Sequence, residues 1–123
     1  MKLCVTSTGA SLDSELDPRF GRSYHFILVD SETLEFQSFE NESLGASGGT
    51  GVQSGKFVAD SGAKIVLTGN VGPKAFSTLG AAGISVITGL AELTVRDSIT
   101  AYHTGNHRTV TGPTASEHAG MRR

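Results

Sequence analysis

Residues 65–76 read Ile65-Val66-Leu67-Thr68-Gly69-Asn70-Val71-Gly72-Pro73-Lys74-Ala75-Phe76. The first three residues form a short apolar run bounded by glycines, which is typical of a buried strand. Pro73 favours the first turn of a helix, and apolar residues then recur at helical spacing as far as Gly83. Because a strand–helix–strand unit returns parallel to its start, this stretch predicts an α/β fold.

The same alternation continues towards the C-terminus. Residues 84–88 repeat the short strand, and Val95, Ile99 and Tyr102 mark a last helix by their spacing. The sheet therefore gains two parallel strands that are joined by helices.

The first half of the chain predicts three antiparallel strands and a helix. Residues 2–6 alternate as a strand, and residues 23–30 and 33–40 indicate a hairpin. Residues 52–61 predict a helix that follows a glycine-rich loop at residues 45–51. Together with the later strands, this order predicts a five-stranded mixed sheet in an α/β domain.

The length of 123 residues predicts one domain. We place this domain at residues 1–104. Residues 105–123 lack periodicity and contain few large apolar side chains, so they cannot bury enough surface to offset the entropy of ordering. We therefore expect a disordered C-terminal tail.

Composition argues against several classes of function. The chain has 10 Lys and Arg against 12 Asp and Glu, so the basic excess that is common in nucleic-acid binders is absent. No apolar run approaches the roughly 18 residues of a membrane span, and the first residues do not form a signal peptide, so we expect a cytoplasmic protein. Cys4 is the single cysteine, which excludes an intramolecular disulfide and any site made of several thiolates from one chain.

A phosphate-binding P-loop is suggested by Gly49-Thr50-Gly51-Val52-Gln53-Ser54-Gly55-Lys56, but the match is incomplete. The first glycine of the motif is replaced by Thr50, and Phe57 stands where a hydroxyl would hold magnesium. The loop also follows the third strand and not the first. We therefore do not expect an ATPase.

A more general anion site is compatible with two glycine-rich loops, at residues 45–51 and 69–72, because each leads into a helix. Loops that follow parallel strands meet at the carboxyl ends of those strands, so both could face one cleft. The alternative is that these glycines serve only turns and close packing.

Arg19 and Arg22 lie in an extended loop at residues 9–22, with no acidic residue between them. If this loop folds over the same cleft, two guanidinium groups would face the anion. The alternative is that they pair at the surface with neighbouring carboxylates: Asp13, Glu15 or Asp17.

Other chemistry has little support in the residues. His103 and His107 have a metal-compatible spacing, but Gly105 between them favours a helix end and solvated histidines. Cys4 in mid-strand favours an inert buried thiol. The first strand has no carboxylate for a two-metal nuclease, and no nucleophile has an evident base, so we do not expect an enzyme.

Four blocks of the sequence, in order and spacing, resemble the dinitrogenase iron–molybdenum cofactor biosynthesis family of the NifX/NifB C-terminal type. The blocks are Asp17-Pro18-Arg19-Phe20-Gly21-Arg22, Gly48-Gly49-Thr50-Gly51-Val52-Gln53, Leu67-Thr68-Gly69-Asn70-Val71-Gly72-Pro73-Lys74-Ala75-Phe76 and Ala81-Ala82-Gly83-Ile84. The resemblance spans residues 1–104. It implies a three-layer, ribonuclease H-like domain without nuclease activity that binds, carries or stores a preformed metal–sulfur cluster.

Two departures from the family pattern bear on how a cluster would be held. Arg19 stands where some members have histidine, and Ser23 stands where some have cysteine. The chain is more similar to the branch that includes the orange protein of sulfate-reducing bacteria, which holds a molybdenum–copper sulfide cluster without covalent attachment. An iron–molybdenum or iron–sulfur cluster is the alternative cargo.

We predict that the cluster is held by amides and guanidinium groups, and that no side chain ligates a metal. The predicted cluster-binding residues are Arg19, Phe20, Gly21, Arg22, Gly48, Gly49, Thr50, Gly51, Gly69, Asn70, Val71 and Gly72. A cluster-accepting protein is an expected partner. The alternative function, suggested by the family, is an interaction or regulatory module that contacts a P-loop ATPase and binds no cluster.

Overall fold

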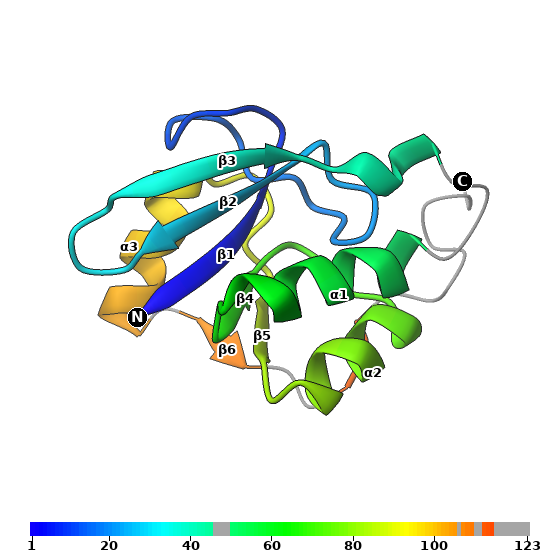
Figure 1. Cartoon of the computed structure of the whole chain (residues 1–123). Coiled ribbons are helices and arrows are strands. Elements are labelled where there is room, and N and C mark those ends of the chain that lie inside the picture. The colour runs from blue at the N-terminus through cyan, green and yellow to red at the C-terminus, as the bar shows by residue number, and fades with distance from the viewer. Residues whose placement is uncertain (46–49, 106, 110–111, 115–123) are drawn as a thin grey trace.

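The computed structural model describes residues 1–45, 50–105, 107–109 and 112–114. The strands are β1 (Lys2–Ser7), β2 (His25–Asp30), β3 (Phe36–Glu40), β4 (Ile65–Leu67), β5 (Ser85–Thr88) and β6 (Arg108–Thr109). The helices are α1 (Thr50–Ser61), α2 (Pro73–Ala81) and α3 (Val95–Thr104), with a short 3₁₀ helix η1 (Glu42–Gly45). The strands form one sheet in the order β3-β2-β1-β4-β5-β6 (Figure 1).

The sheet is mixed, as the sequence predicts. β1 pairs antiparallel with β2, and β2 with β3, while β1 pairs parallel with β4, and β4 with β5. Pro73 begins α2, and the αL glycine Gly105, with φ of +79°, ends α3. The α/β class, the three antiparallel strands and the two parallel strands are therefore confirmed.

The structure differs from the expected disordered tail at residues 107–109 and 112–114. Thr109 and Arg108 pair antiparallel with Ile87 and Thr88, so β6 adds a sixth strand to the five predicted. The open edge of β5 offers backbone donors and acceptors, and such partners leave no trace in hydrophobic periodicity. The other tail residues in the prediction, at 106, 110–111 and 115–123, lie outside the described part.

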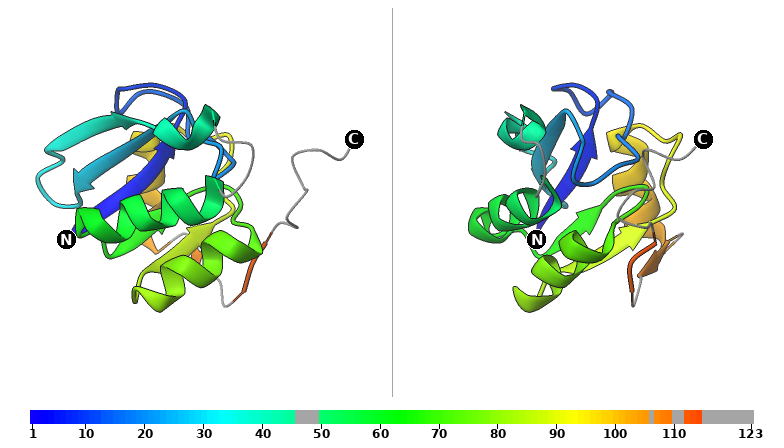
Figure 2. Two further views of the ribbon diagram at one scale, coloured as in Figure 1. Left: turned by 45° about the vertical axis from the view of Figure 1, so that its right-hand side comes forward. Right: turned by 90° about the vertical axis from the view of Figure 1, so that its right-hand side faces the viewer.

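Helices cover both faces of the sheet, which gives three layers. α1 and α2 lie side by side on one face and α3 lies on the other (Figure 2). Successive residues of β1 point to opposite faces, so Cys4 packs on the side of α1 and α2 while Leu3 and Val5 pack on the side of α3. None of the helices in the described residues is long and apolar enough to cross a membrane.

The parallel strands bring several loops to one edge of the sheet. The Asp17 amide N–H donates to the Thr6 carbonyl near the end of β1, and the Thr68 amide N–H donates to the Ile87 carbonyl in β5. The Gly89 amide N–H donates to the Gly69 carbonyl. The carboxyl ends of β1, β4 and β5 therefore meet where α2 begins, which is the edge at which ligands bind in open α/β sheets.

Candidate functional site

The loop at residues 17–22 lies between the start of α1 and the loop at residues 69–72. On one side, the Asn70 N–H donates to the Pro18 carbonyl at 2.8 Å, and the Phe20 N–H donates to the Asn70 carbonyl at 3.2 Å. On the other side, a Cβ placed on Gly21 would lie 3.1 Å from the Cα of Gly51. Three of the predicted segments, containing Arg19, Gly51 and Gly69, are thus brought together. The predicted Gly48 and Gly49 lie outside the described residues.

The buried Asp17 side chain stabilises this loop through hydrogen bonds to its backbone. Its side chain is 2% exposed, and its two carboxylate oxygens accept the backbone N–H groups of Arg19 at 3.1 Å and Tyr24 at 3.2 Å. The Thr6 hydroxyl donates to the Asp17 carbonyl at 2.6 Å. The sequence pattern suggested Asp17 as a surface partner of the arginines, whereas its carboxylate is buried. An aspartate before proline and two residues before Arg19 is a signal for this kind of turn.

A second buried network holds the loop against η1. The Asn41 side-chain amide donates to the carbonyls of Gly21 at 3.2 Å and Ser23 at 2.9 Å, and the Ser43 hydroxyl donates to the Asn41 side-chain oxygen at 2.6 Å. Ser54 of α1 also contacts the Gly21 carbonyl, at 3.5 Å. Asn41 and Ser43 could not be identified from the sequence, because they follow the hairpin without a recognisable motif.

Three of the predicted binding residues have buried side chains: Thr50 at the start of α1, Phe20 and Val71. Phe20 is 2% exposed and its ring packs 5.8 Å from that of Phe26, while Val71 is 1% exposed. Their side chains therefore anchor the loops and do not face a surface ligand. Arg19, Arg22 and Asn70 are exposed, so these three side chains are the ones that can reach a bound anion.

The two arginines differ in their contacts. Arg19 Nε lies 3.8 Å from the Asp17 carboxylate, and 49% of the Arg19 side chain remains exposed. The surface pairing considered as an alternative is therefore partly present, although Asp17 is buried. Arg22 makes no ion pair with another described residue. The guanidinium groups thus retain exposed donors at this edge.

The amides of the loop at residues 69–72 are less available than its sequence suggests. The Asn70 N–H donates to the Pro18 carbonyl, and the Val71 N–H donates to the Thr114 hydroxyl at 2.9 Å. Gly72 is the N-cap of α2 and supplies no side-chain cap. The positive end of α2 therefore adjoins the loop without a capping side chain from Gly72.

The cysteine and histidines in the described part of the chain do not gather into a metal site. Cys4 is fully buried, and burial raises the pKa of its thiol far above the usual range. His103 contacts the Ser31 carbonyl, and His107 stacks on Tyr102 with ring centres 5.5 Å apart. Within the described ranges, no three His, Cys, Asp or Glu side chains gather so that they could hold a metal ion.

Replacing Cys4 by alanine is expected to leave the visible spectrum and the metal content of cluster-loaded protein unchanged. The raised pKa keeps the thiol protonated near neutral pH, and only the thiolate is a good metal ligand. The measurement is absorption and bound metal after loading. In the unmodified protein, a thiol reagent should react with Cys4 only after unfolding. Loss of binding by a folded Cys4→Ala protein would instead identify Cys4 as a ligand.

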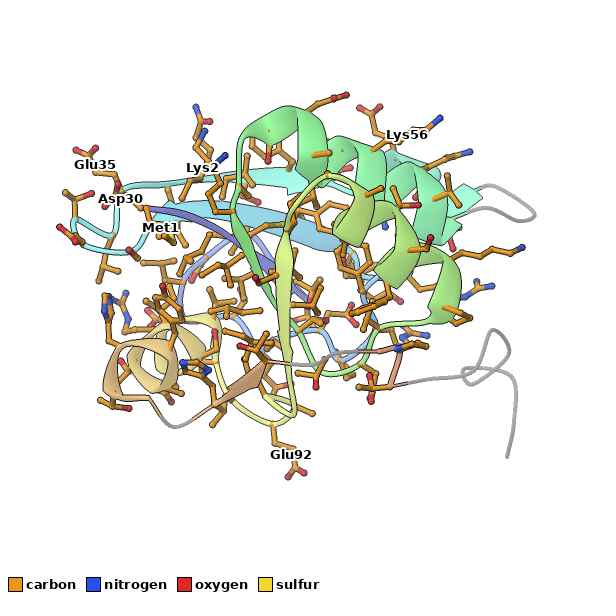
Figure 3. The ribbon with its side chains drawn as sticks, turned by 90° about the horizontal axis from the view of Figure 1, so that it is seen from below. Met1, Lys2, Asp30, Glu35, Lys56 and Glu92 are labelled. Atoms are coloured by element: carbon orange, nitrogen blue, oxygen red, sulfur yellow. The ribbon has the colours of Figure 1, made fainter. Side chains whose placement is uncertain are left out.

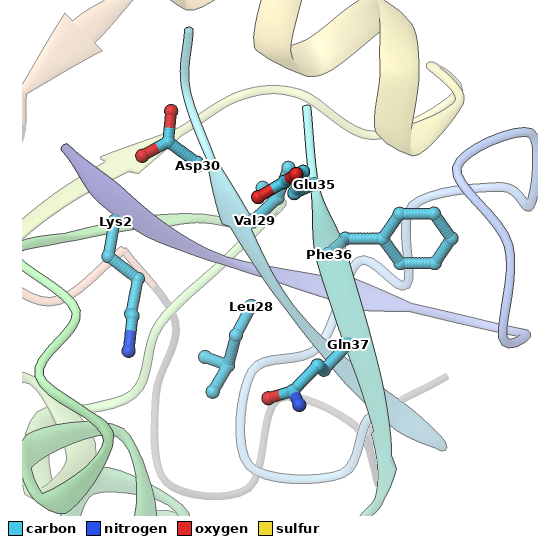
Figure 4. Close-up of a pocket in the computed structure, with 7 residues that line it drawn as sticks. All are labelled: Lys2, Leu28, Val29, Asp30, Glu35, Phe36 and Gln37. Atoms are coloured by element: carbon cyan, nitrogen blue, oxygen red, sulfur yellow. The ribbon is translucent and has the colours of Figure 1, made fainter. Parts of the chain in front are cut away.

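A hollow lies near the start of β1, against the hairpin of β2 and β3 (Figure 4). Lys2, Asp30 and Glu35 line it together with Gln37 and three apolar residues, Leu28, Val29 and Phe36. Figure 3 shows Lys2, Asp30 and Glu35 gathered with Met1 at one end of the molecule, with Lys56 of α1 towards the other end. None of the predicted binding residues lines this hollow.

Comparisons with known proteins agree with the described fold. A family model described as dinitrogenase iron-molybdenum cofactor matches residues 1–105. The apo form of the orange protein from Desulfovibrio gigas is 41% identical, with a TM-score of 0.89 over 92% of this chain and 95% of that chain. A Thermotoga protein described as a candidate NifB protein is 31% identical, with a TM-score of 0.79 over 92% of this chain and 96% of that chain.

A curated relative of Methanocaldococcus jannaschii, itself uncharacterized, is 32% identical over 77 residues. The match covers 60% of this chain and 65% of that relative. The chain thus matches somewhat less than two thirds of the relative's length.

Proposed function

The chain belongs to the dinitrogenase iron-molybdenum cofactor family, and from this premise we propose that it carries a preformed, anionic metal–sulfur cluster at the edge formed by residues 17–22 and 69–72. The cluster is cargo and is held without a covalent bond from the protein. A molybdenum–copper sulfide cluster is the proposed cargo, because the likeness to the orange protein is strong over nearly the whole of both chains.

The observation that carries this proposal is the pairing of the arginine loop with the start of α2. Arg19 pairs with Asn70 in an isolated parallel bridge. Asn70 lies two residues before Gly72, the N-cap of α2, which has no side-chain cap. Exposed guanidinium groups and the positive end of a helix thus occur at one edge. Both favour an anion.

The donor set suits a cluster that brings its own sulfide ligands. Such a cargo needs hydrogen-bond donors and positive charge, and does not need protein thiolates. Cys4 is buried and protonated, which fits this mode of binding. A hydrogen bond to a charged group contributes about 1.5–3 kcal/mol, against about 0.3–1 kcal/mol for an exposed helix dipole, so the arginines supply most of the affinity.

We further propose that the protein acts in the cytoplasm as a carrier and not as an enzyme. A carrier must release its cargo, so its partner is a cluster-accepting protein. Non-covalent binding suits this role, because hydrogen bonds and ion pairs can be exchanged for those of the acceptor without breaking a metal–thiolate bond.

Visible absorption tests the proposed function. Protein isolated without oxygen, or apo protein treated with tetrathiomolybdate and copper, is expected to become coloured and to retain both metals through gel filtration. Copper alone and molybdate alone are the controls, because neither supplies the sulfide-bridged anion. Elemental analysis of protein from its native source identifies the cargo. Protein that stays colourless under both conditions would contradict the carrier role and favour the interaction module.

A further inference from the structure

The segment at residues 112–114 contacts the candidate site from the far end of the chain. The Val71 N–H donates to the Thr114 hydroxyl at 2.9 Å, and the Thr114 N–H donates to the Val71 carbonyl at 2.8 Å. Figure 2 shows this segment in orange-red beside the start of α2. Residues 43 positions apart thus exchange a pair of hydrogen bonds at the loop that leads into α2.

This contact makes the loop at residues 69–72 the middle of three extended segments. Asn70 bonds to Pro18 and Phe20 along one edge, and Val71 bonds to Thr114 along the other. Neighbouring residues of an extended chain direct their backbone groups to opposite sides, so both edges are occupied. The arginine loop covers one edge and the C-terminal segment covers the other.

The two edges differ in how firmly they are held. On the arginine side, Pro18 and Phe20 are secured by buried Asp17 and by the Phe20 ring in the core. On the other side, Thr114 is exposed, and β6 before it is only two residues long. The Thr114 contact is therefore the easier one to open.

We propose that the segment at residues 112–114 is a strap that covers the Val71 amide and is displaced when an anionic cargo takes that amide. This inference rests on the proposed function. A hydroxyl is a neutral acceptor, and an amide bond to an anion is about twice as strong as one to a neutral acceptor. Val71 directly precedes the N-cap Gly72, so an anionic cargo at the start of α2 can compete with the Thr114 hydroxyl for the Val71 N–H.

Thr114→Val tests the strap, because valine keeps the shape of threonine and removes the hydroxyl. Cargo affinity is expected to rise about fivefold, the factor that corresponds to one neutral hydrogen bond no longer competing. Hydrogen exchange at the Val71 amide of the empty protein should become several-fold faster. Thr114→Ser keeps the hydroxyl and should match the unmodified protein, and Thr100→Val removes an exposed hydroxyl on α3 as a second control. The probe is tetrathiomolybdate with copper, titrated by visible absorption.

The two readouts separate the strap from the proposed function. Exchange at Val71 reports the contact without cargo, so unchanged exchange in Thr114→Val overturns the strap. Faster exchange with equal or weaker cargo affinity also overturns it, because the segment then does not compete. If neither the unmodified protein nor Thr114→Val binds the probe, the proposed carrier function is wrong. Displacement of the strap by cargo is then wrong as well, even if faster exchange shows that the Val71–Thr114 contact exists.

Discussion

Replacing Arg19 and Arg22 together by alanine is expected to weaken retention of the metal–sulfide cluster by on the order of 100-fold. Each guanidinium group loses a charge-assisted hydrogen bond, taken at about 1.5 kcal/mol because both side chains are exposed to solvent. Half of the Arg19 side chain is accessible, so the substitutions remove little packing and the protein should fold normally. Titration with tetrathiomolybdate and copper, followed by visible absorption and bound metal, measures the loss.

The matched control for the double arginine variant removes two positive charges at a place far from the proposed site. Lys2 and Lys64 are exposed and adjoin each other at the amino ends of β1 and β4, at the opposite end of the sheet. Lys2→Ala with Lys64→Ala should retain the cluster nearly as well as the unmodified protein. The loss in the arginine variant should also shrink at high salt, because ions screen exposed charges. Equal retention by the two double variants would rule out specific capture by the arginines.

The order of strands and helices could be predicted because its signals are local. The glycines that bound residues 65–67, and Pro73 at the start of α2, act on their own stretch of backbone wherever the chain goes. The repeated short apolar runs then require a sheet covered on both faces. These features predict the α/β class and the direction of the parallel strands, and the composition of residues 23–30 and 33–40 predicts the hairpin.

The contacts that build the site could not be predicted, because they join polar groups that are distant in sequence. Asn41 holds the carbonyl of Gly21, and Thr114 holds the backbone of Val71. Neither partner follows a hydrophobic period, and neither belongs to a motif. A glycine-rich loop indicates that backbone N–H groups are close to the surface. Whether another segment of the chain accepts hydrogen bonds from these groups depends on the tertiary structure.

Gly69→Ala is expected to lower the thermal midpoint by roughly 10–15 °C. A Cβ at this position would lie 2.7 Å from Cα and 2.8 Å from the carbonyl oxygen of Pro18, and these are backbone atoms that cannot swing aside. Overpacking costs about 1–3 kcal/mol, and moving Pro18 also strains its bond from the Asn70 N–H. Calorimetry measures the midpoint. Cluster retention should fall in parallel, because the same displacement separates Arg19 from the start of α2.

Gly80→Ala provides the matched control for this change. Gly80 lies in α2, and a Cβ there has nothing within 4 Å, so alanine should raise stability by about 0.5–1 kcal/mol through its better helix propensity. Cluster retention should not change in this variant. The contrast isolates steric contact from the loss of glycine flexibility, since both variants lose that flexibility. A Gly69→Ala protein with a normal midpoint and normal retention would show that the arginine loop need not lie against residues 69–72, and the proposed site would then have to be abandoned.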